Sequence, residues 1–205
     1  MINDIKGAFS ENKLAIYSAI AIFFISMILG YVFEPSLYSY FNPVVDNLTQ
    51  KIQSGVVKLT FQDIFLNNIK IVFQMFIYGL VFCLSILVLA FNGFFTGYYL
   101  AISDNLLQTL LLIIPHGIFE FSSCILACAS GFVLFHFLYG FLKSIWRQES
   151  KSAKLILRNS FNENSTRLKQ AIILFLIASV LMAIAGFVET YLTIPIAKAI
   201  LSVLS

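Results

Sequence analysis

The chain has 205 residues, of which 60% are hydrophobic and only 11% are charged. An ordinary soluble domain is about 45–50% apolar and about 25% charged, so this chain has too few charges to cover a water-facing surface. Its formal net charge of +3 is too small to indicate a nucleic-acid ligand. Composition therefore excludes a soluble globular protein and predicts an integral membrane protein.

Long uncharged runs predict an all-α, polytopic bundle of about five transmembrane helices. About 20 apolar residues are needed to cross the ~30 Å hydrocarbon core of a bilayer. We interpret the first run as a retained helix, because it is too long for a signal peptide and no A-x-A cleavage site follows it. Within a single membrane domain of residues 1–205, the expected spans are about 14–33, 67–90, 94–114, 118–142 and 170–190.

Breaks in the apolar pattern set these boundaries. Glu34-Pro35 ends the first helix, because proline disfavours helix in the preceding residue. Asn92-Gly93 predicts a tight turn before the third span, and Pro115-His116-Gly117 predicts a break before the fourth. In the expected extracytoplasmic segment 34–66, Asn42 followed by Pro43 is typical of a helix start. Apolar residues then recur at helical spacing as far as Leu59, which predicts a short amphipathic helix.

A basic loop, residues 143–169, sets the expected orientation. It holds seven of the thirteen lysines and arginines in the chain, and such loops stay in the cytoplasm. Five spans then place the N-terminus inside and the C-terminus outside the cell membrane. Five of the basic residues are spaced three or four apart and would form one face of a helix, expected to bind anionic lipid headgroups or an acidic partner: Lys143, Arg147, Lys151, Lys154 and Arg158.

Four polar residues are candidates for an ion or proton site. His116 and Glu120 share a helical face at the outer start of the fourth span, and Glu189 lies at the outer end of the fifth. These groups either cap helix ends at the interface or form a shared pocket for a cation or proton. Na⁺ or Ca²⁺ would suit the carboxylates, whereas Zn²⁺ would recruit the imidazole. Asp104, expected near mid-membrane, either caps half of a kinked third span or belongs to an ion pathway.

The sequence offers no enzyme motif and no cofactor site. It lacks H-E-x-x-H, and no convincing Ser-His-Asp set can be assigned. The cysteines are expected to be small buried hydrophobes, and two patterns of small residues predict close helix packing. The cysteines are Cys83, Cys124 and Cys128, and the packing residues are Gly93 with Gly97, and Ser123 with Ala127 and Gly131.

Several strings resemble the stage II sporulation protein M family of integral membrane proteins. The most specific is Ile114-Pro115-His116-Gly117-Ile118-Phe119-Glu120. Supporting strings are Phe65-Leu66-Asn67-Asn68, Phe91-Asn92-Gly93 followed by Gly97, and Ala185-Gly186-Phe187-Val188-Glu189, so the resemblance covers roughly residues 60–192. It implies a membrane component of an envelope complex that works with peptidoglycan-degrading partners.

Two functions follow as hypotheses. The first is a non-enzymatic scaffold or assembly factor with protein partners or a homo-oligomeric state. The alternative is a small channel or transporter with a cation or proton site at His116, Glu120 and Glu189.

Overall fold

The computed structural model describes residues 2–54, 60–148 and 152–204, which form eight helices and no strand. In chain order the helices are α1 (Ile2–Glu11), α2 (Lys13–Val32), α3 (Glu34–Gln53), α4 (Phe61–Tyr78), α5 (Phe82–Ala101), α6 (Leu106–Arg147), α7 (Ala153–Tyr191) and α8 (Thr193–Leu204). The prediction of an all-α helix bundle is confirmed. Four of the described helices are long and apolar enough to cross a bilayer: α2, α5, α6 and α7.

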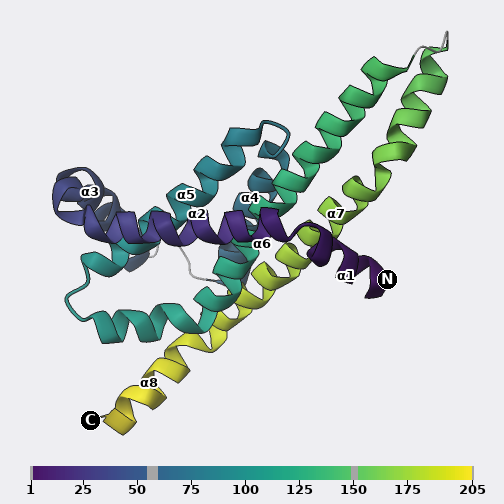
Figure 1. The fold of residues 1–205 in the computed structure, drawn as a ribbon. Helices are drawn as coiled ribbons and strands as arrows, with labels where there is room; N and C mark the ends of the chain where they lie inside the picture. The colour runs from purple at the N-terminus through teal and green to yellow at the C-terminus, as the bar shows by residue number, and fades with distance from the viewer. Residues whose placement is uncertain (1, 55–59, 149–151, 205) are drawn as a thin grey trace.

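Helices α6 and α7 form the long axis of the molecule and run side by side in opposite directions (Figure 1). Helices α2 and α5 pack against each other, and α4 packs against α5, α6 and α7. Helix α1 lies beside α7, where Lys169 Nζ donates to Asp4 Oδ1 at 2.7 Å. This hydrogen bond lowers the pKa of the Asp4 carboxyl.

The surface of α7 separates a protein-facing side from a lipid-facing side. Buried side chains recur every three or four residues along one face: Ala171, Leu174, Ala178, Met182 and Ala185. Exposed apolar side chains recur in the same way along another: Ile172, Leu176, Val180, Ile184 and Phe187. An apolar surface this long is stable only in lipid, so the chain is a multi-pass membrane protein.

Glycine lets α2 and α5 approach until their backbones touch. A Cβ atom on Gly97 would overlap the Met27 carbonyl oxygen, and one on Gly30 would overlap that of Phe94. Helices in lipid gain little from hydrophobic association and depend on such close van der Waals contact. The G-x-x-x-G pair therefore packs one chain internally.

The third predicted span is displaced along the sequence, and α4, where the second was expected to begin, is not among the four described helices long and apolar enough to cross a bilayer. The turn expected at Asn92-Gly93 is wrong, because both residues lie inside α5. A Cβ on Gly93 would come within 2.5 Å of the Phe23 carbonyl oxygen, so this glycine serves packing. The chain turns instead at residues 79–81, between α4 and α5.

The break expected at Pro115-His116-Gly117 is also wrong, because α6 continues through these residues. Proline removes one backbone hydrogen bond and bends a long packed helix without ending it. The ribbon of α6 bends in its first part (Figure 1). The chain instead connects α5 to α6 through residues 102–105.

Asp104 lies exposed in that connection and not in the middle of a span, so its predicted depth is wrong. The cap of α6 is its neighbour Asn105, whose side-chain oxygen accepts from the backbone N–H of Gln108 at 3.1 Å. Asp104 was misplaced because the third span was expected twelve residues too late, at 94–114 against the observed Phe82–Ala101.

The predicted basic loop is mostly helical. The last turns of α6 and the first four turns of α7 form a stalk, residues 137–147 and 153–168. Across it Ser144 Oγ donates to Glu163 at 2.5 Å, and Gln148 Nε2 donates to Ser160 Oγ at 3.2 Å. The prediction that the five basic residues share one face of a single helix is therefore wrong. Lys143 and Arg147 lie on α6, whereas Lys154 and Arg158 lie on α7. Lys151 is outside the described residues. Spacing alone cannot distinguish one helix from two arms of a hairpin.

Helix α3 begins at Glu34, eight residues before the expected Asn42-Pro43 start. Only Phe33 separates it from α2, so Glu34-Pro35 changes the chain direction without ending helical structure. Pro35 occupies the first turn, where no backbone hydrogen bond is lost. Residues 55–59 of the expected amphipathic helix lie outside the described part of the chain.

Replacing Gly97 with alanine should destabilise the bundle, because the new methyl group would overlap the Met27 carbonyl oxygen. Overpacking of this kind costs about 1–3 kcal/mol. Thermal unfolding in detergent would measure the loss. Gly7→Ala is the matched control, since its Cβ would meet Glu11 Oε1 at an ordinary 3.6 Å. Equal melting temperatures for the two variants would contradict the packing argument.

Candidate metal site

Three ionisable side chains converge where the first part of α6, about three turns past its start, meets the end of α7. His116 and Glu120 lie one turn apart on α6, and Glu189 lies in the last turn of α7. One ligand atom from each side chain lies within 4.8 Å of the other two. The structure therefore brings together the three residues that were expected to share a pocket, named here the His-Glu-Glu cluster.

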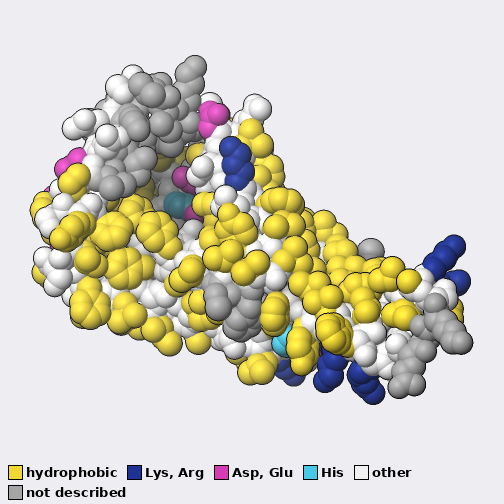
Figure 2. All heavy atoms as spheres, turned by 90° about the horizontal axis from the view of Figure 1, so that it is seen from above, with side chains coloured by type: hydrophobic (Ala, Val, Ile, Leu, Met, Phe, Trp, Pro, Cys, Tyr) yellow, Lys and Arg dark blue, Asp and Glu magenta, His cyan; other side chains and the backbone are white. Residues whose placement is uncertain are grey.

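The cluster is largely enclosed and lacks a basic partner. The His116 and Glu120 side chains are 15% and 22% exposed, with 4.0 Å between Nε2 and Oε2. Within the described parts of the chain, no lysine or arginine forms an ion pair with Glu120 or Glu189. Figure 2 shows acidic and histidine side chains at the floor of a hollow. Carboxylates on membrane-spanning helices are costly unless a cation or proton neutralises them.

The other nitrogen of His116 is held from α8. Its Nδ1 lies 3.2 Å from Thr193 Oγ1. The Thr193 hydroxyl in turn donates to the Val188 carbonyl oxygen at 3.1 Å. Thr193 is buried and opens α8 directly after Leu192, so the joint between α7 and α8 fixes the orientation of the imidazole ring.

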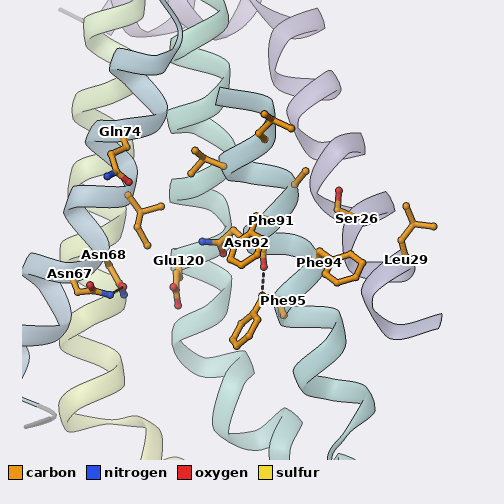
Figure 3. Close-up of a pocket in the computed structure, with 15 residues that line it drawn as sticks. Ser26, Leu29, Asn67, Asn68, Gln74, Phe91, Asn92, Phe94, Phe95 and Glu120 are labelled. Atoms are coloured by element: carbon orange, nitrogen blue, oxygen red, sulfur yellow. Dashed lines mark hydrogen bonds between the residues drawn. The ribbon is translucent and has the colours of Figure 1, made fainter. Parts of the chain in front are cut away.

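A pocket of about 1000 Å³ adjoins the cluster, and Glu120 forms part of its wall. In Figure 3 the Glu120 carboxylate faces the space between α4 and α5, with Asn67 and Asn68 projecting toward it from α4. Four amide side chains line the pocket: Asn67, Asn68, Gln74 and Asn92. Phe91, Phe94 and Phe95 complete its α5 wall. A carboxylate among amides and aromatic rings suits a hydrated or organic cation.

The remaining candidate residues lie apart from this centre. Asp104 is exposed in the 102–105 connection, and the basic residues lie on the stalk. Cys124 and Cys128 are buried in the packed part of α6, as expected, while the side chain of Cys83 is outside the described set. Ser123, Ala127 and Gly131 are also buried there, and the Ser123 hydroxyl donates to the Ala178 carbonyl oxygen of α7 at 2.7 Å.

Sequence reasoning missed Gln74 and Thr193. Gln74 follows Asn67 by seven residues, which places both on one helical face, and this repeat was the available signal. Thr193 carried no signal, because a threonine between two apolar helices has no distinctive pattern.

The sequence pattern of the Stage II sporulation protein M (SpoIIM) family matches residues 19–194. The chain belongs to this family. The match contains the whole His-Glu-Glu cluster, Thr193 and every residue of the pocket wall. The resemblance noted in the sequence is thereby confirmed.

Two curated proteins of Methanocaldococcus jannaschii are similar along almost their whole length. The uncharacterized protein MJ0793 is 27% identical over 93% of this chain and 99% of its own. The uncharacterized protein MJ0706 is 29% identical over 94% of this chain and 87% of its own. No solved structure matches the chain significantly. Both relatives are uncharacterized, so neither assigns a ligand to the His-Glu-Glu cluster.

Water should fill the pocket beside Glu120, because its amides need hydrogen-bond partners. In a chain without native cysteines, Asn68→Cys should react with a polar thiol reagent, which requires an ionised, hydrated thiol. Leu176→Cys, on the lipid-facing side of α7, should react at least tenfold more slowly. Similar labelling rates would show that the pocket is dry.

Proposed function

We propose that this SpoIIM-family protein is a small, non-enzymatic channel or transporter of the cell membrane that binds a cation at the His-Glu-Glu cluster. The position of Glu120 carries the proposal. Its carboxylate belongs to the three-residue cluster and also to the wall of the adjoining pocket. A cation in the pocket would therefore contact a cluster residue directly.

The charge balance supports a cation over an anion or a neutral solute. Glu120 and Glu189 bring two carboxylates together without a lysine or arginine partner in the described part of the chain. Two carboxylates this close repel each other when ionised, and a bound cation removes the repulsion. Amide oxygens from α4 and α5 can replace part of the hydration shell of the ion along the pocket.

The polar character of α4 is consistent with this role. The helix has 18 residues, a length of about 27 Å at 1.5 Å per residue. Asn67, Asn68 and Gln74 line the pocket, so these polar side chains can contact a cation that passes through it. We therefore count α4 as a fifth crossing, which together with the basic stalk gives a cytoplasmic N-terminus and an extracytoplasmic C-terminus.

A scaffold role is the second candidate, and the stalk favours it. Trp146 is 89% exposed there and lies between Lys143 and Arg147 on the last turns of α6. Exposed tryptophan beside arginine is typical of residues that anchor a protein partner, and the lysines would also attract anionic headgroups. This role is compatible with transport, because the stalk begins more than four helical turns beyond Glu120 along α6.

Cation binding should raise the melting temperature of the purified protein, because only the folded state holds the three ligands together. A panel of Na⁺, Ca²⁺, Mg²⁺, Mn²⁺ and Zn²⁺ should contain at least one stabilising ion. Glu120→Gln should abolish that shift, and Glu189→Gln should reduce it. Asp104→Asn is the matched control, since this exposed carboxylate lies outside the cluster. The absence of any shift across the panel would overturn the proposed site.

The orientation has its own test in intact cells. An impermeant thiol reagent applied from outside should leave Ser165→Cys on the stalk unlabelled and should label Asp104→Cys. Both probes would be placed singly in a chain without native cysteines. Labelling of the stalk probe from outside would reverse the proposed topology.

A further inference from the structure

We infer that the ligand of the His-Glu-Glu cluster is a first-row transition-metal dication of the zinc type, and that Thr193 is the residue that positions its histidine ligand. This inference rests on the proposed cation site and narrows it to one chemical class. It excludes the oxygen-loving alkali and alkaline-earth ions as the preferred occupants.

The hydrogen bonds around His116 assign the nitrogen that faces the carboxylates. The Val188 carbonyl oxygen can only accept a hydrogen bond. Both contacts of Thr193 Oγ1 are hydrogen bonds at the same time only when its hydroxyl donates to Val188 and accepts from His116, which places the ring proton on Nδ1. The Nε2 lone pair is left free, and this is the nitrogen that lies 4.0 Å from Glu120 Oε2.

A free imidazole lone pair within 4.8 Å of two carboxylate oxygens is a metal-ligand arrangement. A neutral Nε2 gives no ion pair with Glu120, so the 4.0 Å contact is not itself stabilising. Metal-binding histidines usually donate their second ring N–H to an oxygen outside the metal shell, which orients the ring and raises its basicity. Thr193 supplies that oxygen from a different helix, independently of the three ligands.

The donor set selects the class of ion. Calcium takes six to eight oxygen ligands, and magnesium prefers oxygens while keeping several waters. The imidazole nitrogen is the discriminating donor, because imidazole is a ligand of zinc and its neighbours and not of calcium or magnesium. Zinc held by three protein ligands leaves a fourth position for water or cargo. Because Glu120 also lines the pocket, that fourth position is reached from the pocket.

The separation of the ligand atoms is close to what such an ion requires. Zinc bonds of about 2.0–2.1 Å in a tetrahedral shell place ligand atoms about 3.4 Å apart. The three atoms here lie within 4.8 Å, so a contraction of about 1.4 Å would complete the shell. Rotamer adjustments of the two glutamate side chains are sufficient for a movement of this size.

The test is equilibrium binding of four ions to the intact, chelator-treated chain in detergent: Zn²⁺, Mn²⁺, Ca²⁺ and Mg²⁺. Zinc should bind at least a hundredfold more tightly than calcium or magnesium, and Co²⁺ should give the visible absorption of a nitrogen-containing tetrahedral site. His116→Ala should remove the preference for zinc. Preferred calcium binding would overturn this inference and leave the proposed cation site standing, whereas no binding by any ion would overturn both.

The positioning role of Thr193 is tested by removing its hydroxyl group and then restoring it. Thr193→Val should weaken zinc binding about 10–100-fold, the usual effect of removing an oxygen that supports a metal-bound histidine, and Thr193→Ser should restore it. Thr190→Val is the matched control, because the Thr190 hydroxyl donates to the Gly186 carbonyl oxygen of its own helix and, among the described residues, has no hydrogen bond to the cluster. The ratio of zinc to calcium affinity separates positioning from general destabilisation. An unchanged ratio in Thr193→Val would refute the positioning role. If Thr193→Val does not fold, a loss of the zinc preference in Thr193→Ser, which keeps the hydroxyl, would refute it instead.

Discussion

Close contact between α6 and α7 is the constraint on which the rest of the structure depends. Hydrophobic association is weak between helices in lipid, so they are held by small side chains and by hydrogen bonds across the interface. Residues 123–134 of α6 are all buried, and the Ser123 hydroxyl reaches the Ala178 carbonyl oxygen. The same pair of helices carries Glu120 and Glu189. Backbone packing therefore fixes the distance between the two helices, and only side-chain rotation can change the separation of the two carboxylates.

The sequence was sufficient for the fold class and for the core of the site. His116 and Glu120 share a face by helical periodicity, and the topology places Glu189 at the same end of the bundle. The predicted grouping of these three residues did not depend on the exact helix boundaries, because the fourth and fifth spans carry all three. The predicted depth of Asp104 was wrong, since it depended on where the third span began.

The errors at Asn92-Gly93 and Pro115 have one physical origin. Glycine and proline interrupt isolated helices, but glycine in a bundle also removes a side chain where two backbones touch, as Gly93 does against Phe23. A long packed helix likewise tolerates one missing hydrogen bond at Pro115. A single sequence cannot separate these uses, because the neighbouring helix that decides between them is distant in the chain.

The amides of α4 have a consequence for how the protein enters the membrane. Lys70 near the middle of α4 and three pocket amides make this helix a poor substrate for insertion by itself, since a charged group at the centre of an inserted helix costs about 2.5–3.5 kcal/mol. Only residues 79–81 separate it from the apolar α5. With α4 as the fifth crossing proposed above, the two helices should leave the translocation machinery together as a hairpin. Biogenesis would then wait for α5 to be synthesised before α4 commits to the bilayer.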